Sequence, residues 1–238
     1  MYKKKSQLIL LHFAGGSKYS YDFLKKYFKN TNIEIHALEL PGRGKRYQED
    51  FVKDKEAAIN DYIHQIKQLR NNQPYLIFGH SMGATLGLTI TKRMEEIGDI
   101  PISLIVSGNP GPGIKEYAGN EKRYLMNDVD FKEEGRELGG VPEEVLTNEE
   151  LYSFFEPIMR ADFRVLENDE FSEKNTKLKT PILAIMGDEE MMNTKINNWN
   201  TFTTGNFRSK IFKGNHFFIP DNAKQLADLI ISQSLVVY

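Results

Sequence analysis

Residues 76–84 contain the sequence Leu76-Ile77-Phe78-Gly79-His80-Ser81-Met82-Gly83-Ala84. The apolar run ending at Phe78 predicts a buried strand, and a helix is predicted from Ala84 to Met94. A strand, the pattern G-x-S-x-G and a helix form the setting of a nucleophile elbow, a sharp turn that exposes a serine. On so tight a turn, side chains at Gly79 and Gly83 would collide with neighbouring backbone. The pattern alone is weak, but its place between strand and helix predicts that Ser81 is a nucleophile.

Apolar runs alternate with amphipathic segments on both sides of this stretch. The runs are nearly continuous in hydrophobic residues, as expected of strands buried on both faces. Strands that alternate with helices are joined by right-handed crossovers, which predicts an α/β fold with a mostly parallel, doubly wound sheet. The expected strands are 7–12, 33–40, 75–78, 102–107, 181–186 and 208–212, and the expected helices of the core are 21–28, 54–70, 84–94, 195–202 and 222–232.

The alternation stops between about residues 114 and 175, where no strand-like run occurs and the charged segments have helical spacing. In an open α/β sheet, an insertion at this place lies above the carboxyl ends of the strands, where ligands bind. We therefore expect a single domain, 1–238, with a helical lid inserted at about 114–175. The expected lid helices are 122–126, 131–138, 142–146 and 148–167.

Length and composition exclude several classes of protein. A chain of 238 residues can form one α/β domain with a full core. The net charge of −2 gives no nucleic-acid footprint, and the absence of cysteine excludes disulfides, a thiolate metal site and a cysteine nucleophile. The apolar run after the basic residues 1–6 is too short for a signal peptide, and no stretch is long enough to span a bilayer. We expect a cytoplasmic protein that binds neither nucleic acid nor membrane.

A serine nucleophile needs a general base, and the base needs a third group that orients its ring. Hydrolases with a nucleophile elbow place the acid after a late strand and the histidine after the last one. Of the five histidines, only His216 occupies such a loop. His64 lies on the polar face of a helix, His36 lies inside a strand, and His80 is expected on the far side of the elbow. His12 could line the site or make a structural hydrogen bond.

The acid is one of three carboxylates in Gly187-Asp188-Glu189-Glu190, which directly follows the strand 181–186. Their side chains cannot all face His216. Hydrolases of this kind commonly have the acid three residues after the glycine, which favours Glu190, and glutamate is an accepted variant. Asp188 remains the alternative, because a shorter side chain nearer the strand end could also hold the base.

A tetrahedral intermediate needs two N–H donors for its oxyanion. One is expected from the backbone of Met82, at the start of the helix after Ser81. The other is expected from Ala14 in the loop His12-Phe13-Ala14-Gly15-Gly16, because the glycines let the backbone approach the reacting atoms closely.

Seven stretches between about residues 8 and 230 occur in the same order as in one known protein family. They are Leu10-Leu11-His12-Phe13-Ala14-Gly15-Gly16-Ser17, Leu40-Pro41-Gly42-Arg43-Gly44-Lys45-Arg46, Phe78-Gly79-His80-Ser81-Met82-Gly83-Ala84, Val106-Ser107-Gly108, Leu138-Gly139-Gly140-Val141-Pro142, Pro157-Ile158-Met159-Arg160-Ala161-Asp162-Phe163 and Gly214-Asn215-His216-Phe217-Phe218. Together they resemble the type II (external, editing) thioesterases of nonribosomal peptide and polyketide synthesis.

The resemblance implies an α/β-hydrolase fold with a helical lid. It also implies hydrolysis of acyl or aminoacyl thioesters on the phosphopantetheine arm of carrier proteins, which clears mis-primed or stalled synthetase modules. It maps the nucleophile onto Ser81, the base onto His216, and the oxyanion donors onto Ala14 and Met82.

The sequence departs from the family at the acid, where aspartate is usual and Glu190 stands, and the segment from there to Trp199 is short. Within the lid, Arg160 and Asp162 are expected to form a structural ion pair that anchors the lid helix to the core.

The partner implied by the resemblance is an acyl or peptidyl carrier protein domain, which brings the phosphopantetheine with it. We therefore expect no metal and no cofactor of the protein's own, and a monomer. An esterase or acyl-CoA hydrolase is the alternative, because a fold does not fix a substrate. A non-catalytic binding protein that keeps the pocket is a more distant one.

Overall fold

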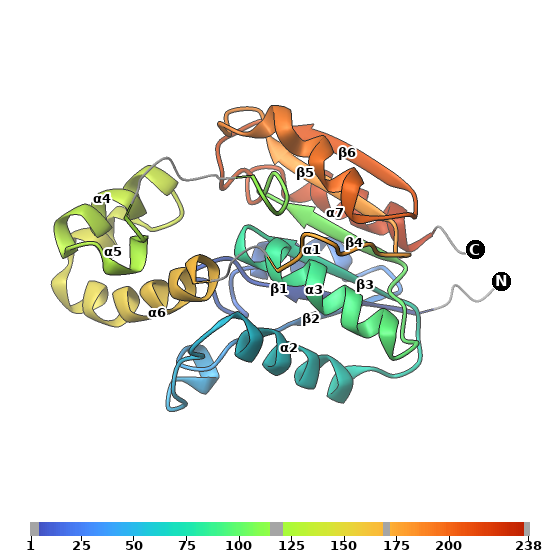
Figure 1. The fold of residues 1–238 in the computed structure, drawn as a ribbon, viewed down its shortest axis with the longest axis horizontal. Helices are drawn as coiled ribbons and strands as arrows, with labels where there is room; N and C mark the ends of the chain where they lie inside the picture. Colours follow the sequence, from blue (N-terminus) through green and yellow to red (C-terminus); the bar gives the residue numbers. More distant parts are fainter. Residues whose placement is uncertain (1–4, 115–120, 169–171, 236–238) are drawn as a thin grey trace.

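The computed structural model describes residues 5–114, 121–168 and 172–235. Six strands form one sheet in the order β2-β1-β3-β4-β5-β6, and each strand runs parallel to its neighbours. The predicted parallel sheet is therefore confirmed (Figure 1). The strands are β1 Ser6–Leu11, β2 Ile33–Ala37, β3 Tyr75–His80, β4 Ser103–Ser107, β5 Ile182–Gly187 and β6 Phe207–Phe212.

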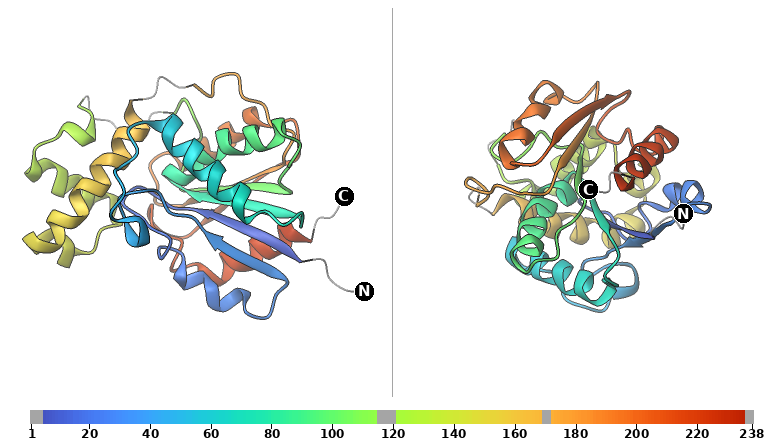
Figure 2. Two further views of the ribbon diagram at one scale, coloured as in Figure 1. Left: turned by 90° about the horizontal axis from the view of Figure 1, so that it is seen from below. Right: turned by 90° about the vertical axis from the view of Figure 1, so that its right-hand side faces the viewer.

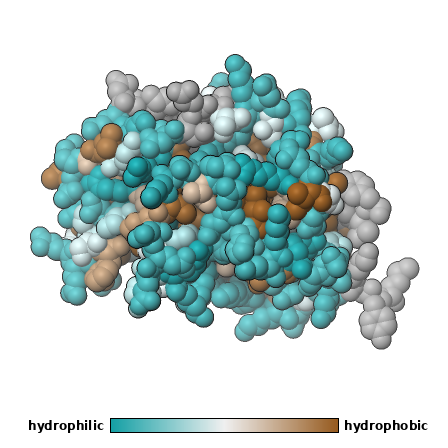
Figure 3. All heavy atoms as spheres, turned by 60° about the horizontal axis from the view of Figure 1, so that its bottom comes forward, coloured by the Kyte–Doolittle hydropathy of each residue, from teal (hydrophilic) through white to brown (hydrophobic). Residues whose placement is uncertain are grey.

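Helices cover both faces of the sheet (Figure 2). Successive strand residues point to opposite faces, so Ile9 of β1 belongs to one buried apolar layer and Leu10 to the other. α2 (Lys55–Leu69), α3 (Met82–Glu96) and the 3₁₀ helix η3 (Asn193–Phe202) pack on the first layer, and α1 (Asp22–Phe28) and α7 (Ala223–Ser234) on the second. Because helices cover both sides of the sheet, its apolar side chains are buried. The side of the molecule drawn in Figure 3 is largely hydrophilic, with small scattered apolar patches.

The parallel arrangement brings the carboxyl ends of the strands to one edge of the sheet. Leu11 pairs with Gly79, His80 with Ser107, and Gly187 with Phe212, so the last residues of β1, β3, β4, β5 and β6 lie along this edge. The loops that follow these strands therefore lie side by side.

A helical insertion between β4 and β5 lies beyond this edge, at the end of the molecule opposite both termini (Figure 1). It has an apolar cluster of its own, formed by Phe131, Leu146, Tyr152, Met159 and Phe163. Residues 115–120 and 169–171 of the predicted lid lie outside the described residues. The described elements are the 3₁₀ helix η2 (Arg123–Leu125), α4 (Asp128–Leu138), α5 (Glu143–Thr147) and α6 (Glu149–Glu167).

Among residues 5–114, 121–168 and 172–235, no helix combines the length and the apolar character that a bilayer span requires.

Candidate active site

Ser81 stands on a strained turn between β3 and α3. Its φ of 52° and ψ of −113° lie in a region that residues other than glycine rarely adopt. A Cβ on Gly79 would lie 2.1 Å from the carbonyl oxygen of Gly83, and a Cβ on Gly83 would lie 2.2 Å from that of Leu11. The steric reason predicted for both glycines is confirmed. The Ser81 N–H donates to the carbonyl oxygen of Ser107 at 2.8 Å, which fixes the turn to β4.

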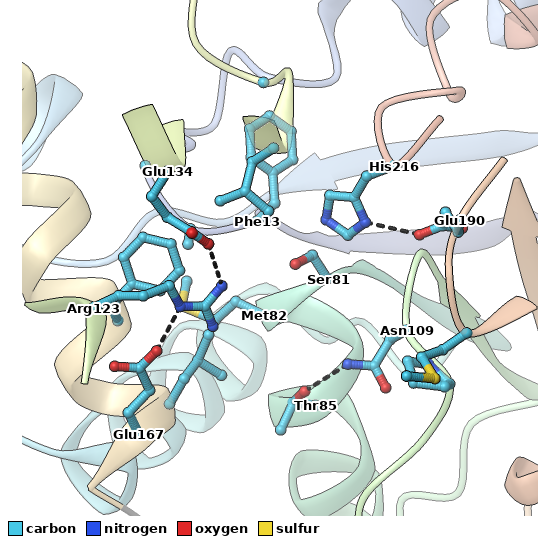
Figure 4. A pocket seen from close by; sticks show the side chains of 18 of the residues that line it. Phe13, Ser81, Met82, Thr85, Asn109, Arg123, Glu134, Glu167, Glu190 and His216 are labelled. Atoms are coloured by element: carbon cyan, nitrogen blue, oxygen red, sulfur yellow. Dashed lines mark hydrogen bonds and ion pairs between the residues drawn. The ribbon is translucent and has the colours of Figure 1, made fainter. Parts of the chain in front are cut away.

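A cavity of about 940 Å³ lies between the carboxyl edge of the sheet and the lid. Ser81, Met82, Glu190 and His216 line it from the core (Figure 4). Ala14 lines it as well. The structure thus brings the proposed nucleophile, base, favoured acid and oxyanion donors to one cavity, which the alternative acid Asp188 does not line. In the part of the chain that the structure describes, no group of three or more histidine or carboxylate side chains is placed to hold a metal ion.

Glu190 is the acid that contacts His216. Its Oε1 lies 2.8 Å from Nδ1 of His216, and its Oε2 accepts a hydrogen bond from the N–H of Gly187 at 2.6 Å. A carboxylate at this place accepts the Nδ1 proton, so the lone pair of the neutral ring is on Nε2. This is the tautomer that can take a proton from a serine.

Asp188, the alternative acid, binds backbone instead. Its Oδ1 accepts from the N–H of Gly214 at 2.8 Å, and the N–H of Glu189 donates to the Gly214 carbonyl oxygen at 3.1 Å. A Cβ on Gly187 would lie 2.2 Å from that same oxygen, so the two loops touch at the glycine. Asp188 ties the acid turn to the histidine loop, and Glu190 is left to face the ring.

The two proposed oxyanion donors come from neighbouring strand ends. Met82 is the first residue of α3, so its N–H has no acceptor inside the helix and lies at the positive end of the helix dipole. Ala14 lies in a tight turn in which the Gly16 N–H donates to the carbonyl oxygen of Phe13 at 2.9 Å. Their role toward an oxyanion stays a prediction.

The expectation that His80 lies on the far side of the elbow is wrong. Its ring centroid lies 5.0 Å from that of His216, and its Nδ1 lies 3.0 Å from Oγ of Ser107. The alternation of side chains along β3 predicts the face of the sheet to which His80 points. It does not show that the loop after β6 folds back over the end of β3. Burial, with a contribution from the charge of His216, lowers the pKa of His80 well below its usual value. His80 is thus a neutral, packed neighbour of His216.

The other histidines have structural or surface roles. His12 is buried, its Nδ1 lies 2.8 Å from the Phe13 carbonyl oxygen, and its Nε2 accepts from the N–H of Leu40 at 3.4 Å. Burial and the charge of Arg43 lower the pKa of His12 to about 4. His36 contacts Gln7, and exposed His64 contacts Gln68, as expected of a strand residue and a solvated helix residue.

The predicted ion pair between Arg160 and Asp162 is wrong. Residues two positions apart on a helix point to different sides, so these two side chains cannot meet. Arg160 stays within the lid and binds Asp128, Glu156 and two carbonyl oxygens. Asp162 anchors the helix to the core, as expected, but through Arg43.

The lid wall of the cavity holds a charged group that the sequence does not predict. Arg123 lies between Glu134, at 3.4 Å from Nη1, and Glu167, at 2.5 Å from Nε (Figure 4). Burial raises the pKa of Glu134. The partners are 11 and 44 positions from Arg123, and no motif in the sequence connects them.

Comparison with known proteins agrees with this geometry. Residues 6–234 match the family model described as a thioesterase domain. The chain is 30% identical over 215 residues to the probable cadicidin biosynthesis thioesterase of Streptomyces griseus. The aligned region covers 90% of this chain and 58% of that longer one. It is 27% identical over 236 residues to the gramicidin S biosynthesis protein GrsT of Aneurinibacillus migulanus, which covers 98% of this chain and 90% of that one.

A solved structure is similar over nearly the whole chain. The type II thioesterase BorB from the borrelidin biosynthetic cluster has a TM-score of 0.85 and 30% identity, over 97% of this chain and 93% of that one. This similarity confirms the expected α/β-hydrolase fold.

Proposed function

Because this chain belongs to the thioesterase domain family, we propose that it hydrolyses acyl or aminoacyl thioesters on the phosphopantetheine arm of carrier proteins. In this role it clears mis-primed or stalled modules of a nonribosomal peptide or polyketide synthetase. The observation that carries the proposal is Ser81 on its strained turn, in one cavity with the hydrogen-bonded pair His216 and Glu190. The relatives described above are named for the biosynthesis of cadicidin, gramicidin S and borrelidin, which supports this setting.

The proposed reaction has two halves. In the first, Nε2 of His216 takes the proton of Ser81 while Oγ attacks the thioester carbonyl carbon, and the negative oxygen is bound by the N–H groups of Ala14 and Met82. His216 then gives its proton to the pantetheine sulfur, which leaves as a thiol. In the second half, His216 takes a proton from water, the hydroxide attacks the acyl-enzyme, and the proton returns to Ser81. Glu190 holds the ring throughout.

The acyl group and the carrier have separate places in this proposal. The acyl group occupies the cavity under the lid, and the carrier stays outside with its arm reaching in. The arm belongs to the substrate, so the reaction needs no cofactor of the enzyme's own. The substrates are attached to a synthetase, so the enzyme must meet them in the same compartment, which we take to be the cytoplasm, and we propose that it acts as a monomer.

The test compares one acyl group on two thiols. We expect a higher kcat/KM for the group on a carrier protein than for the same group on coenzyme A, because only the carrier can contact the outer surface. Equal kcat/KM values on both substrates would reject a carrier protein as the preferred substrate and would favour an acyl-CoA hydrolase. A fluorophosphonate probe should label Ser81 in the wild type and not in Ser81→Ala, and failure to label the wild type would favour a binding protein.

A further inference from the structure

A buried ion pair joins the lid helix α6 to the core. Arg43, which follows β2, donates from Nη1 to Oδ2 of Asp162 at 2.6 Å and from Nη2 to Oδ1 at 2.7 Å. The Arg43 side chain is 2% exposed and that of Asp162 is 0% exposed. Burial alone would lower the pKa of Arg43, but the charge and hydrogen bonds of Asp162 outweigh it and raise the pKa, so the arginine stays charged.

Both partners of this pair also hold the backbone of the loop after β1. Oδ2 of Asp162 accepts a hydrogen bond from the N–H of Gly15 at 2.8 Å, and Nη1 of Arg43 donates to the carbonyl oxygen of Gly16 at 3.2 Å. The loop lies tightly against α6, because a Cβ on Gly15 would lie 2.8 Å from the ring of Phe155. Gly15 also has a φ of 77°, which a glycine adopts without strain.

The orientation of the Ala14 N–H depends on these contacts. The Phe13 carbonyl and the Ala14 N–H belong to one planar peptide unit, so they point in opposite directions. The Phe13 oxygen accepts from the N–H of Gly16 at 2.9 Å and lies 2.8 Å from Nδ1 of His12. Gly16 is in turn held by Arg43, and Gly15 by Asp162. The ion pair thus fixes both residues that close the turn around Ala14.

We propose that Arg43 and Asp162 are positioning residues that aim the N–H of Ala14 at the oxygen of the bound thioester carbonyl. The inference rests on the proposed function, since it assigns the Ala14 N–H to the oxyanion. It gives the lid helix α6 a part in the chemistry, because a carboxylate of that helix sets one of the two donors. A pair that served only to anchor the lid would affect the stability of the fold and leave the reaction on folded protein unchanged.

The test is the substitution Asp162→Asn. An amide has one acceptor oxygen, so it cannot accept from Gly15 and from both nitrogens of Arg43. We expect kcat to fall by about 10- to 100-fold with KM unchanged. This loss is smaller than the loss caused by removing an oxyanion donor, because the Ala14 N–H stays present but is misdirected. A trifluoromethyl ketone, which forms a tetrahedral adduct with a serine, should bind more weakly by a similar factor.

Asp99→Asn is the matched control. Asp99 forms a bidentate pair with Arg70 at 2.8 and 2.9 Å, and the pair lies near the amino ends of the strands, away from the cavity. We expect this variant to lower the thermal midpoint without changing kcat. If Asp162→Asn likewise lowers only the midpoint, with kcat and the inhibitor affinity unchanged, the positioning role is rejected.

The double variant Arg43→Gln with Asp162→Asn covers the case in which the single variant does not fold. It removes both charges, so no unpaired charge stays buried. A folded double variant with wild-type kcat would overturn the inference, and a reduced kcat with unchanged KM would support it. Ser81→Ala separates the two proposals: loss of activity there with wild-type kcat in the double variant rejects only the positioning role, and full activity in Ser81→Ala rejects both.

Discussion

Oε1 of Glu190 lies 2.8 Å from Nδ1 of His216, although the two residues are 26 positions apart. The carboxylate comes from the turn after β5 and the ring from the loop after β6, the neighbouring strand. The other carboxylate oxygen, Oε2, is held by the N–H of Gly187 at the start of the turn. The glutamate side chain thus folds back on its own turn, so that one carboxylate oxygen is held by backbone while the other faces the ring.

Glu190→Gln should lower kcat by about 10³- to 10⁴-fold, because an amide can favour the wrong tautomer of the catalytic histidine. Steady-state hydrolysis of an acyl thioester measures the change. Asp188→Asn is the control. Its amide oxygen can still accept from the N–H of Gly214, so kcat should change by less than about threefold. A larger loss in Asp188→Asn than in Glu190→Gln would assign the acid to Asp188.

Ser81→Ala should abolish thioester hydrolysis and leave the fold intact. Ser81 is half-buried, and the substitution removes only the hydroxyl oxygen from the turn. The thermal midpoint should stay within about 2 °C of the wild type, since alanine bears the same backbone strain as serine at this φ. Differential scanning fluorimetry and a hydrolysis assay check both parts. Activity within about tenfold of wild type would contradict the assignment of the nucleophile.

Stability should fall as the pH drops below about 6.5, because two histidines are buried in neutral form. The pKa of His12 is lowered to about 4, and that of His80 lies well below 6.5. The unfolded chain binds these protons near pH 6.5 and the folded chain does not. The free energy of unfolding is therefore not reduced by these two groups above about pH 6.5. Below that pH, each of the two histidines reduces it by about 1.4 kcal/mol per pH unit, and for His12 this continues until the pH reaches about 4.

Urea unfolding at several pH values between about 7 and 5 measures this slope. His12→Asn should reduce this slope by the contribution of one histidine. An unchanged slope in His12→Asn would contradict the assignment of a depressed pKa to His12.

Gly140→Ala should lower kcat more than it lowers stability. A Cβ on Gly140, in the loop after α4, would lie 2.0 Å from the ring of Phe217. That ring packs edge-on against His216 with centroids 5.1 Å apart, so its displacement disturbs the proposed base. We expect a loss of about 3- to 10-fold in kcat, as a small misplacement of a catalytic group produces.

Gly135→Ala is the control for this substitution. A Cβ on Gly135, inside α4, would lie no closer than 3.6 Å to another side chain, which is ordinary contact. Alanine is also the better helix former, so activity should hold and stability should rise slightly. Equal activities of the two variants would show that the lid loop does not bear on His216.

The core elements were predictable because each leaves a local signal. Gln7–His12 and Tyr75–Phe78 are apolar runs, and β1 and β3 lie there within two residues of the expected ends. β2 ends at Ala37, whereas the predicted strand continued through Leu38 and Glu39 to Leu40. Leu38 and Leu40 are buried by packing against the α2 side of the core, and burial alone does not continue a strand.

The candidate site was predictable where chain order fixes it. Ser81 follows from the elbow, and His216 follows from its place after the last strand. The sequence could only narrow the acid to neighbouring carboxylates, because the path of the turn after Gly187 decides which of them faces the ring. The partner of Asp162 could not be found at all, since Arg43 is 119 positions away and the pairing depends on how the lid sits on the core.

The lid has its own apolar cluster, so lid residues that line the cavity can change in evolution independently of residues at the strand ends. Phe155, Met159 and Phe163 line the cavity from α6, while Ser81 and His216 line it from the strand ends of the core. Substitutions at these three positions can therefore change the shape of the cavity while Ser81 and His216 keep their geometry. The same division offers a route to engineering: Phe155, Met159 and Phe163 could be varied to accept other acyl chains, with Gly140 and Asp162 kept unchanged.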